Sequence, residues 1–226
     1  MRSYQPLFTE LPPTRLERWD RLAEFAAFWH GVDCSAIDYT RPALQTETRL
    51  HVTLPRALVE WYERFSRFIN LWSDRSFTLP INRIRIEDRT LILRSESIFN
   101  GIAEAKWGIP LVDIESDDPN VVCMLGSKHH LCAHSVSEFA IHCAMFDTIN
   151  KRHAEEIPCE NEIPFPAEGK KACFPESFGV IKTEMYEGTN WIALVSGTDW
   201  YVRQREPETG TDRFIKHELR TEGLPP

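Results

Sequence analysis

Four acidic side chains follow one another closely in the stretch GIAEAKWGIPLVDIESDDPNVV, residues 101–122. They are Asp113, Glu115, Asp117 and Asp118. If this segment is extended, the first three alternate along the chain and point to the same side. Such a cluster could bind Ca²⁺ or Mg²⁺ through its carboxylate oxygens, act as catalytic carboxylates, or present negative charge to a partner protein.

The surrounding residues favour a turn over a metal loop. An EF-hand loop needs a glycine at its sixth position and a distant bidentate glutamate, and the sequence has neither there. A glycosidase or nuclease site would need a second constellation of residues, and we find none. Asp118-Pro119 favours a turn because proline restricts the residue before it. We therefore expect a solvated turn, with a protein-binding surface as the second interpretation and a metal or catalytic site as the third.

Histidine and cysteine side chains gather between residues 129 and 143. They are His129, His130, Cys132, His134, His142 and Cys143. Thiolate and imidazole ligands at short spacing can bind zinc, and a cysteine beside a histidine can form a nucleophilic dyad. The spacing fits neither C-x-x-C nor a helical H-E-x-x-H. Adjacent residues of a helix point about 100° apart, so the last two cannot easily share one ion. We therefore expect structural roles for these residues.

Charge and hydropathy exclude several other classes of function. The net charge is -8, which repels nucleic acid and anionic membranes and favours a basic partner. We find no P-loop, no dinucleotide-binding glycine motif and no nucleophile elbow. No apolar run is long enough to span a bilayer, and the N-terminus lacks the apolar core of a signal peptide. We predict a cytoplasmic protein with six reduced cysteines and no cofactor.

Two helices are predicted in the first third of the chain. Thr14 and Glu17 form a capping box that opens a helix over 14–30, and Gly31 ends it. Residues 32–52 carry no clear period and are expected to be irregular. Leu54-Pro55 opens the second helix, whose apolar stripe ends near Asp74.

The pattern then changes to strands, a third helix and further strands. We expect strands around 84–86, 91–93, 102–107 and 120–125, and a helix from the capping box Ser135/Glu138 to about Lys151. Residues 155–178 read as a connection, about 178–205 as a three-stranded β-meander, and 212–220 as a terminal helical turn. This order predicts an α+β fold with a largely antiparallel, twisted sheet flanked by helices.

The order of motifs over about residues 50–150 resembles the SUKH superfamily, which includes the Smi/Knr regulators of fungi and many bacterial immunity proteins. The matching motifs are the Leu54-Pro55 helix, the Leu91-Ile92-Leu93 strand, Trp107-Gly108-Ile109, Asp118-Pro119 and Ser137-Glu138-Phe139. The region Ser95–Asn100 departs from the Glu-Asn-Gln that is frequent in the family, and Asn120 stands where a second proline is common.

The resemblance implies one non-enzymatic SUKH-like domain over residues 1–226, with the 14–30 helix and the meander added to the family core. It further implies an immunity protein that binds and neutralises a cognate polymorphic toxin, possibly a nuclease, in the cytoplasm. The residues expected to contact this basic toxin are Asp113, Glu115, Asp117 and Asp118, with Trp107 either beneath them or wholly in the core. A regulatory scaffold module is the alternative function, and a metal- or carboxylate-dependent enzyme is the third.

Overall fold

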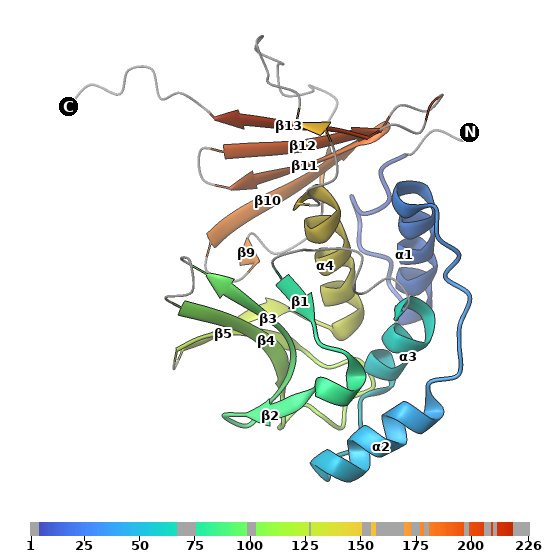
Figure 1. Ribbon diagram of the computed structural model, residues 1–226, viewed down its shortest axis with the longest axis vertical. Coiled ribbons are helices and arrows are strands. Elements are labelled where there is room, and N and C mark those ends of the chain that lie inside the picture. Colours follow the sequence, from blue (N-terminus) through green and yellow to red (C-terminus); the bar gives the residue numbers. More distant parts are fainter. Residues whose placement is uncertain are drawn as a thin grey trace, which may run out of the picture.

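The computed structural model describes residues 5–66, 76–98, 103–126, 128–150, 155–156, 170–172, 177–178, 181–196, 199–205, 209 and 212–218. Within these residues four α-helices accompany two sheets (Figure 1). The helices are α1 (Arg15–His30), α2 (Thr40–Leu50), α3 (Arg56–Phe65) and α4 (Val136–Asn150). The predicted α+β class is confirmed.

Helix α1 begins and ends where the sequence predicts. Thr14 and Glu17 form the reciprocal hydrogen bonds of a capping box, and Gly31 closes the helix in the left-handed conformation with a φ of 65°. The apolar side chains on one face of α1 are buried, including those of Trp19, Phe25 and Trp29. Helix α3 begins one residue after Pro55, and the predicted continuation to Asp74 lies outside the described residues.

The first sheet is antiparallel and has the order β1-β3-β4-β5-β6, with β2 also pairing with β3. Its strands are β1 (Ser76–Thr78), β2 (Arg85–Glu87), β3 (Thr90–Ile98), β4 (Ala103–Pro110), β5 (Val121–Leu125) and β6 (Lys128–Ala133), and the short helix η2 (Ile81–Arg83) precedes β2. The predicted strands at 91–93, 102–107 and 120–125 correspond to β3, β4 and β5. Gly108 lets β3 and β4 approach, because a Cβ there would lie 2.4 Å from the carbonyl oxygen of Leu91.

The meander forms a separate second sheet with the order β7-β13-β12-β11-β10-β8, and β9 pairs with β10. Its strands are β7 (Glu155–Glu156), β8 (Lys170–Lys171), β9 (Ser177–Phe178), β10 (Ile181–Gly188), β11 (Trp191–Ser196), β12 (Asp199–Arg205) and β13 (Asp212–Glu218). All its pairs are antiparallel except β13 with β7.

Helix α4 is the central element of the fold. It contacts α1, α3, β6, β11 and β12, and Figure 1 shows it between the two sheets. Apolar side chains occupy all its faces, and Phe139, Ile141 and Met145 are fully buried. A helix that is apolar all round must be covered on all sides, which explains why both sheets and two helices surround it.

Two expectations about the elements are wrong, and one strand was not predicted. Residues 40–50 form α2 where we expected irregular chain, because this helix buries only Ala43 and Thr46 and so lacks an apolar stripe. Residues 212–218 form strand β13, where the backbone pairs with β12, and not a helical turn. Residues 128–133 form strand β6, which the sequence did not indicate because four of its six residues are exposed.

Candidate protein-contact site

The acidic stretch forms a series of turns between β4 and β5. The amide of Asp113 donates to the carbonyl of Pro110 (2.9 Å), and that of Ser116 donates to the carbonyl of Asp113 (3.0 Å). The amide of Leu111 donates to the carbonyl of Arg89 (2.9 Å). The segment is therefore not extended, and the expectation that alternating carboxylates share one side does not apply to it.

The second half of this loop is fixed to the starts of two helices. The carbonyl of Asp117 accepts from the amide of Ala57 in the first turn of α3 (2.8 Å). The carboxylate of Asp118 accepts from the amide (3.0 Å) and hydroxyl (2.5 Å) of Ser137 in the first turn of α4. Helix N-termini carry unpaired amides and partial positive charge, so both contacts stabilise the loop.

Arg18 and Arg15 of α1 lie beside the same loop. The Arg18 guanidinium is 3.8 Å from the Asp118 carboxylate and donates to the hydroxyl of Ser135 (2.8 Å). The Arg15 guanidinium is 3.8 Å from the carboxylate of Asp117, whose side chain is 81% exposed. Asp118 is thus part of a half-buried network, while the side chain of Asp117 is mostly in solvent.

Glu60 of α3 forms a second polar centre beneath the loop. Its carboxylate accepts from Arg15 Nε (2.8 Å), Arg56 Nε (2.9 Å) and Trp19 Nε1 (2.9 Å). Burial opposes the charge of Glu60, but the hydrogen bonds from Trp19 and Arg56 outweigh it and hold the pKa below its ordinary value. These hydrogen bonds hold α1 against α3 and occupy the carboxylate oxygens of Glu60.

The first half of the loop presents its side chains to solvent. Val112 is 78% exposed, Glu115 is exposed and Asp113 is half-buried. Within the described part of the chain, neither carboxylate forms an ion pair. We call Val112, Asp113 and Glu115 the loop tip. Sequence reasoning missed Val112, because it stands in the mostly apolar stretch Ile109–Ile114 and no local signal distinguishes it from its buried or half-buried neighbours.

Trp107 lies in the core. It is 2% exposed, and its position on β4 pairs with Cys123 of β5 and Arg94 of β3. Of the two interpretations given by the sequence, the structure supports the core position. The indole is therefore buried in the sheet from which the loop emerges and is not exposed for contact with a partner.

The histidine and cysteine residues are divided between the core and the surface. His142, Cys132 and Cys143 are buried, whereas His129 and His130 are exposed on β6. Burial lowers the pKa of His142 to about 3 and raises the pKa of Cys143. Both therefore remain neutral near pH 7, and buried neutral thiols are poor nucleophiles. Among the described residues, no three such side chains are grouped as metal ligands.

Comparisons with known proteins give no family for this chain. No protein-family model matches it, no curated protein is significantly similar to it, and no solved structure matches it. The resemblance to the SUKH superfamily therefore stays a prediction from sequence motifs. Within the described residues, no helix is both long and apolar enough to cross a membrane.

Proposed function

We propose that this protein is a non-enzymatic immunity protein of the cytoplasm, which binds a basic toxin through the loop tip and blocks it. The observation that supports this proposal is the loop tip itself, where the exposed Val112 is followed by two carboxylates, Asp113 and Glu115, that form no ion pairs. An exposed apolar side chain with charged neighbours is a common form of protein contact.

Attachment of the loop to the fold favours binding. The loop is hydrogen-bonded to Arg89 at its start and to Ala57 and Ser137 near its end. A loop held in one conformation before binding loses less conformational entropy when the complex forms. The carboxylates add attraction toward a basic surface and speed encounter, in keeping with the net charge of -8.

The sequence predicts that Asp117 and Asp118 contact the partner, but in this proposal they fix the loop to the fold. Asp118 fixes the loop to α4, and Asp117 contributes mainly its carbonyl to α3. Asp113 and Glu115 are left as the carboxylates that meet the partner. The proposed contact surface is therefore smaller than the four-residue cluster, and it includes Val112.

The experiment is a pull-down from native lysate at low and high salt, followed by purification of the partner and titration with variants. The test variant combines Val112→Ser with Glu115→Gln. The matched control combines Leu131→Ser with Glu10→Gln, since both residues are exposed and lie outside the loop.

Immunity by occlusion predicts one basic, growth-inhibiting partner whose toxicity is relieved by co-expression of this chain. Its affinity should fall about tenfold or more in the test variant and stay unchanged in the control. Equal affinity of both variants would remove the loop tip from the interface. Only endogenous, non-toxic partners would favour a regulatory scaffold.

A further inference from the structure

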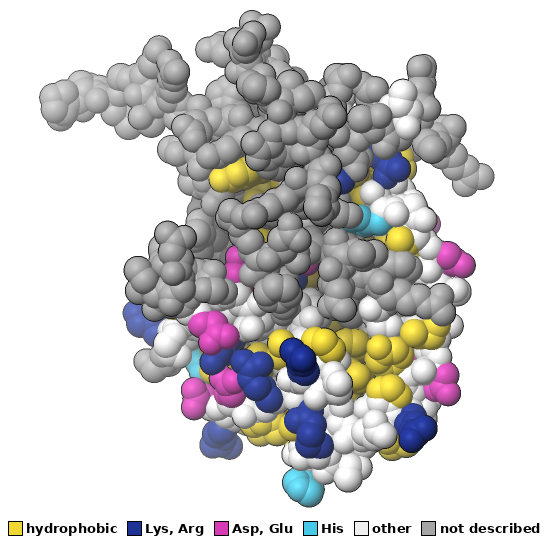
Figure 2. Space-filling view, viewed as in Figure 1, with side chains coloured by type: hydrophobic (Ala, Val, Ile, Leu, Met, Phe, Trp, Pro, Cys, Tyr) yellow, Lys and Arg dark blue, Asp and Glu magenta, His cyan; other side chains and the backbone are white. Residues whose placement is uncertain are grey.

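A group of arginine residues without carboxylate partners lies at the end of the molecule formed by α2, η2 and the β2–β3 turn. They are Arg41, Arg49, Arg83 and Arg89, and we call them the arginine surface. All four are exposed. In Figure 2, Lys and Arg side chains gather in the lower part of the view, the end where Figure 1 places α2 and β2, and hydrophobic groups lie among them.

These arginines differ from most others in the described residues. Seven other arginines each have a carboxylate at ion-pair distance: Arg15, Arg18, Arg21, Arg56, Arg64, Arg85 and Arg94. Arg41, Arg83 and Arg89 make no side-chain ion pair or hydrogen bond, and Arg49 donates only to the carbonyl of Ile84 (2.6 Å). Positive charge without a carboxylate partner attracts anionic groups, even in a protein whose net charge is -8.

The fold brings Arg49 and Arg83 together from separate segments, with Arg41 further along α2 and Arg89 at the β2–β3 turn. The Thr46 hydroxyl donates to the carbonyl of Ile81 (3.1 Å), which fixes α2 on η2, and Arg49 reaches the residue that follows Arg83. Arg41 lies two helical turns before Arg49, or about 12 Å along the helix axis. Asp88 and Arg89 both have positive φ, as the central residues of a tight hairpin turn do. This turn places Arg89 beyond the end of β2.

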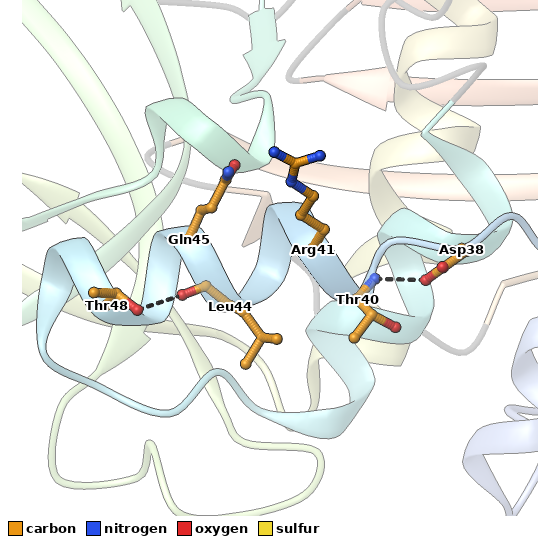
Figure 3. A pocket seen from close by; sticks show the side chains of 6 residues that line it. All are labelled: Asp38, Thr40, Arg41, Leu44, Gln45 and Thr48. Atoms are coloured by element: carbon orange, nitrogen blue, oxygen red, sulfur yellow. Dashed lines mark hydrogen bonds between the residues drawn. The ribbon is translucent and has the colours of Figure 1, made fainter.

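Helix α2 adds an apolar contact beside these charges. Its outward face carries Arg41, Leu44, Gln45 and Thr48, which together with Asp38 and Thr40 line a shallow depression that is open to solvent (Figure 3). Leu44 is 56% exposed. The Asp38 carboxylate accepts from the amide of Thr40 (2.9 Å) at the start of this helix.

We propose that the arginine surface binds an acidic polypeptide segment, whose carboxylates pair with the arginines and whose apolar side chains contact Leu44. A polypeptide fits better than a nucleic acid or an anionic membrane. Exposed carboxylates stand close to two of the arginines in the chain, Asp38 before Arg41 and Asp88 before Arg89, and a continuous phosphate backbone would be repelled there. An acidic peptide can place neutral residues opposite these carboxylates. The proposal does not depend on the function proposed for the loop tip.

The test uses the full chain and a short fluorescein-labelled peptide rich in glutamate and leucine, followed by anisotropy at low and high salt. A peptide with glutamine in place of glutamate is the ligand control. The test variant combines Arg41→Gln, Arg83→Gln and Arg89→Gln, because these side chains have no structural partner. The control variant combines Arg21→Gln, Lys128→Gln and Lys170→Gln, which changes net charge equally at exposed positions elsewhere.

We expect salt-sensitive binding of the acidic peptide, about tenfold weaker in the test variant and unchanged in the control variant. Equal binding by the two variants, or no binding to the wild type at low salt, would overturn the proposal. A single-stranded oligonucleotide or phosphatidylglycerol vesicles could bind more tightly than the acidic peptide and lose this binding in the test variant. That result would overturn the choice of a polypeptide. Thermal unfolding checks that both variants are folded.

Discussion

Arg94 and Asp147 form a buried ion pair that joins β3 to α4. The guanidinium donates two hydrogen bonds to the carboxylate, at 2.8 and 2.5 Å, and both side chains are inaccessible to solvent. Burial opposes the charge of Arg94, but the adjacent carboxylate outweighs it and raises the pKa above its ordinary value. The Arg94 guanidinium therefore stays charged near neutral pH, whereas burial raises the pKa of Asp147 and the adjacent guanidinium opposes that rise.

We expect Asp147→Ala to destabilise the protein by about 3–5 kcal/mol, because a buried guanidinium loses its carboxylate. The double variant Arg94→Met with Asp147→Leu should be far less destabilised, since apolar side chains of similar size need no solvation. Urea unfolding of Arg94→Met, of Asp147→Leu and of the double variant measures the coupling free energy. Additive losses would contradict a coupled pair.

His142 makes stability depend on pH. Burial lowers its folded-state pKa from 6.5 to about 3. Between these values the unfolded chain binds a proton at His142 that the folded protein does not, so stability is lost as pH falls below 6.5. The slope from this group reaches about 1.4 kcal/mol per pH unit.

His142→Gln should remove this slope because the amide does not titrate. The difference in unfolding free energy between wild type and variant is measured by urea unfolding at pH 7.5 and pH 5. Glu138 lies 4.0 Å from the imidazole, and burial raises its pKa, so its effect on the pH dependence of stability is opposite to that of His142. Comparison of the wild type and the variant at equal pH cancels this effect. The exposed His129→Gln is the matched control, and an equal slope in both variants would contradict the assignment.

At the scale of elements, the loop between β4 and β5 has two halves with different roles. Asp118→Ala should destabilise the protein by about 1–2 kcal/mol, because it removes the acceptor for the first turn of α4. Alanine at Asp113, Glu115 and Asp117 together should change stability by about 0.5 kcal/mol or less, since Glu115 and Asp117 are exposed and the half-buried Asp113 forms no ion pair. Thermal and urea unfolding of the two variants compare these effects, and equal losses would show that the loop is not divided in this way.

The elements that the sequence predicted are those whose signals are local. The capping box at Thr14 and the apolar stripe of α3 lie within a few residues and survive in the structure. Helix α2 and strand β6 bury few side chains, so hydrophobic periodicity could not reveal them. Strand β13 exists through its pairing with β12, a contact that no local pattern encodes.

The location of the candidate site could be predicted from the sequence, but the role of each of its residues could not. The acidic stretch and its turn could be located from composition alone. The capping of α4 by Asp118 joins residues 19 positions apart, and the bond from Ala57 to Asp117 joins two distant segments. These contacts depend on how the helices pack, so sequence could not separate the anchoring carboxylate from those at the loop tip.

At the scale of the whole molecule, the second sheet is hydrogen-bonded to the N-terminal segment, to α1 and to α4. Buried Glu187 of β10 accepts from the amides of Leu7 (3.0 Å) and Phe8 (2.8 Å). Arg203 of β12 donates to the carbonyl of Thr148 near the C-terminal end of α4. Arg205 donates to the carbonyl of Phe28 in the last turn of α1. Arginines at helix C-termini are favourable because the unpaired carbonyls there carry partial negative charge.

These contacts predict that the two sheets unfold together. Far-UV circular dichroism and tryptophan fluorescence should give one coincident transition in urea. Glu187→Ala leaves two amides without their acceptor and should lower the midpoint by the same amount for both probes, with a loss of about 2–5 kcal/mol. Gln204→Ala, at an exposed position of β12, should leave the midpoint unchanged. Separate transitions, or a shift seen by one probe alone, would mean that the second sheet folds independently of α1 and α4.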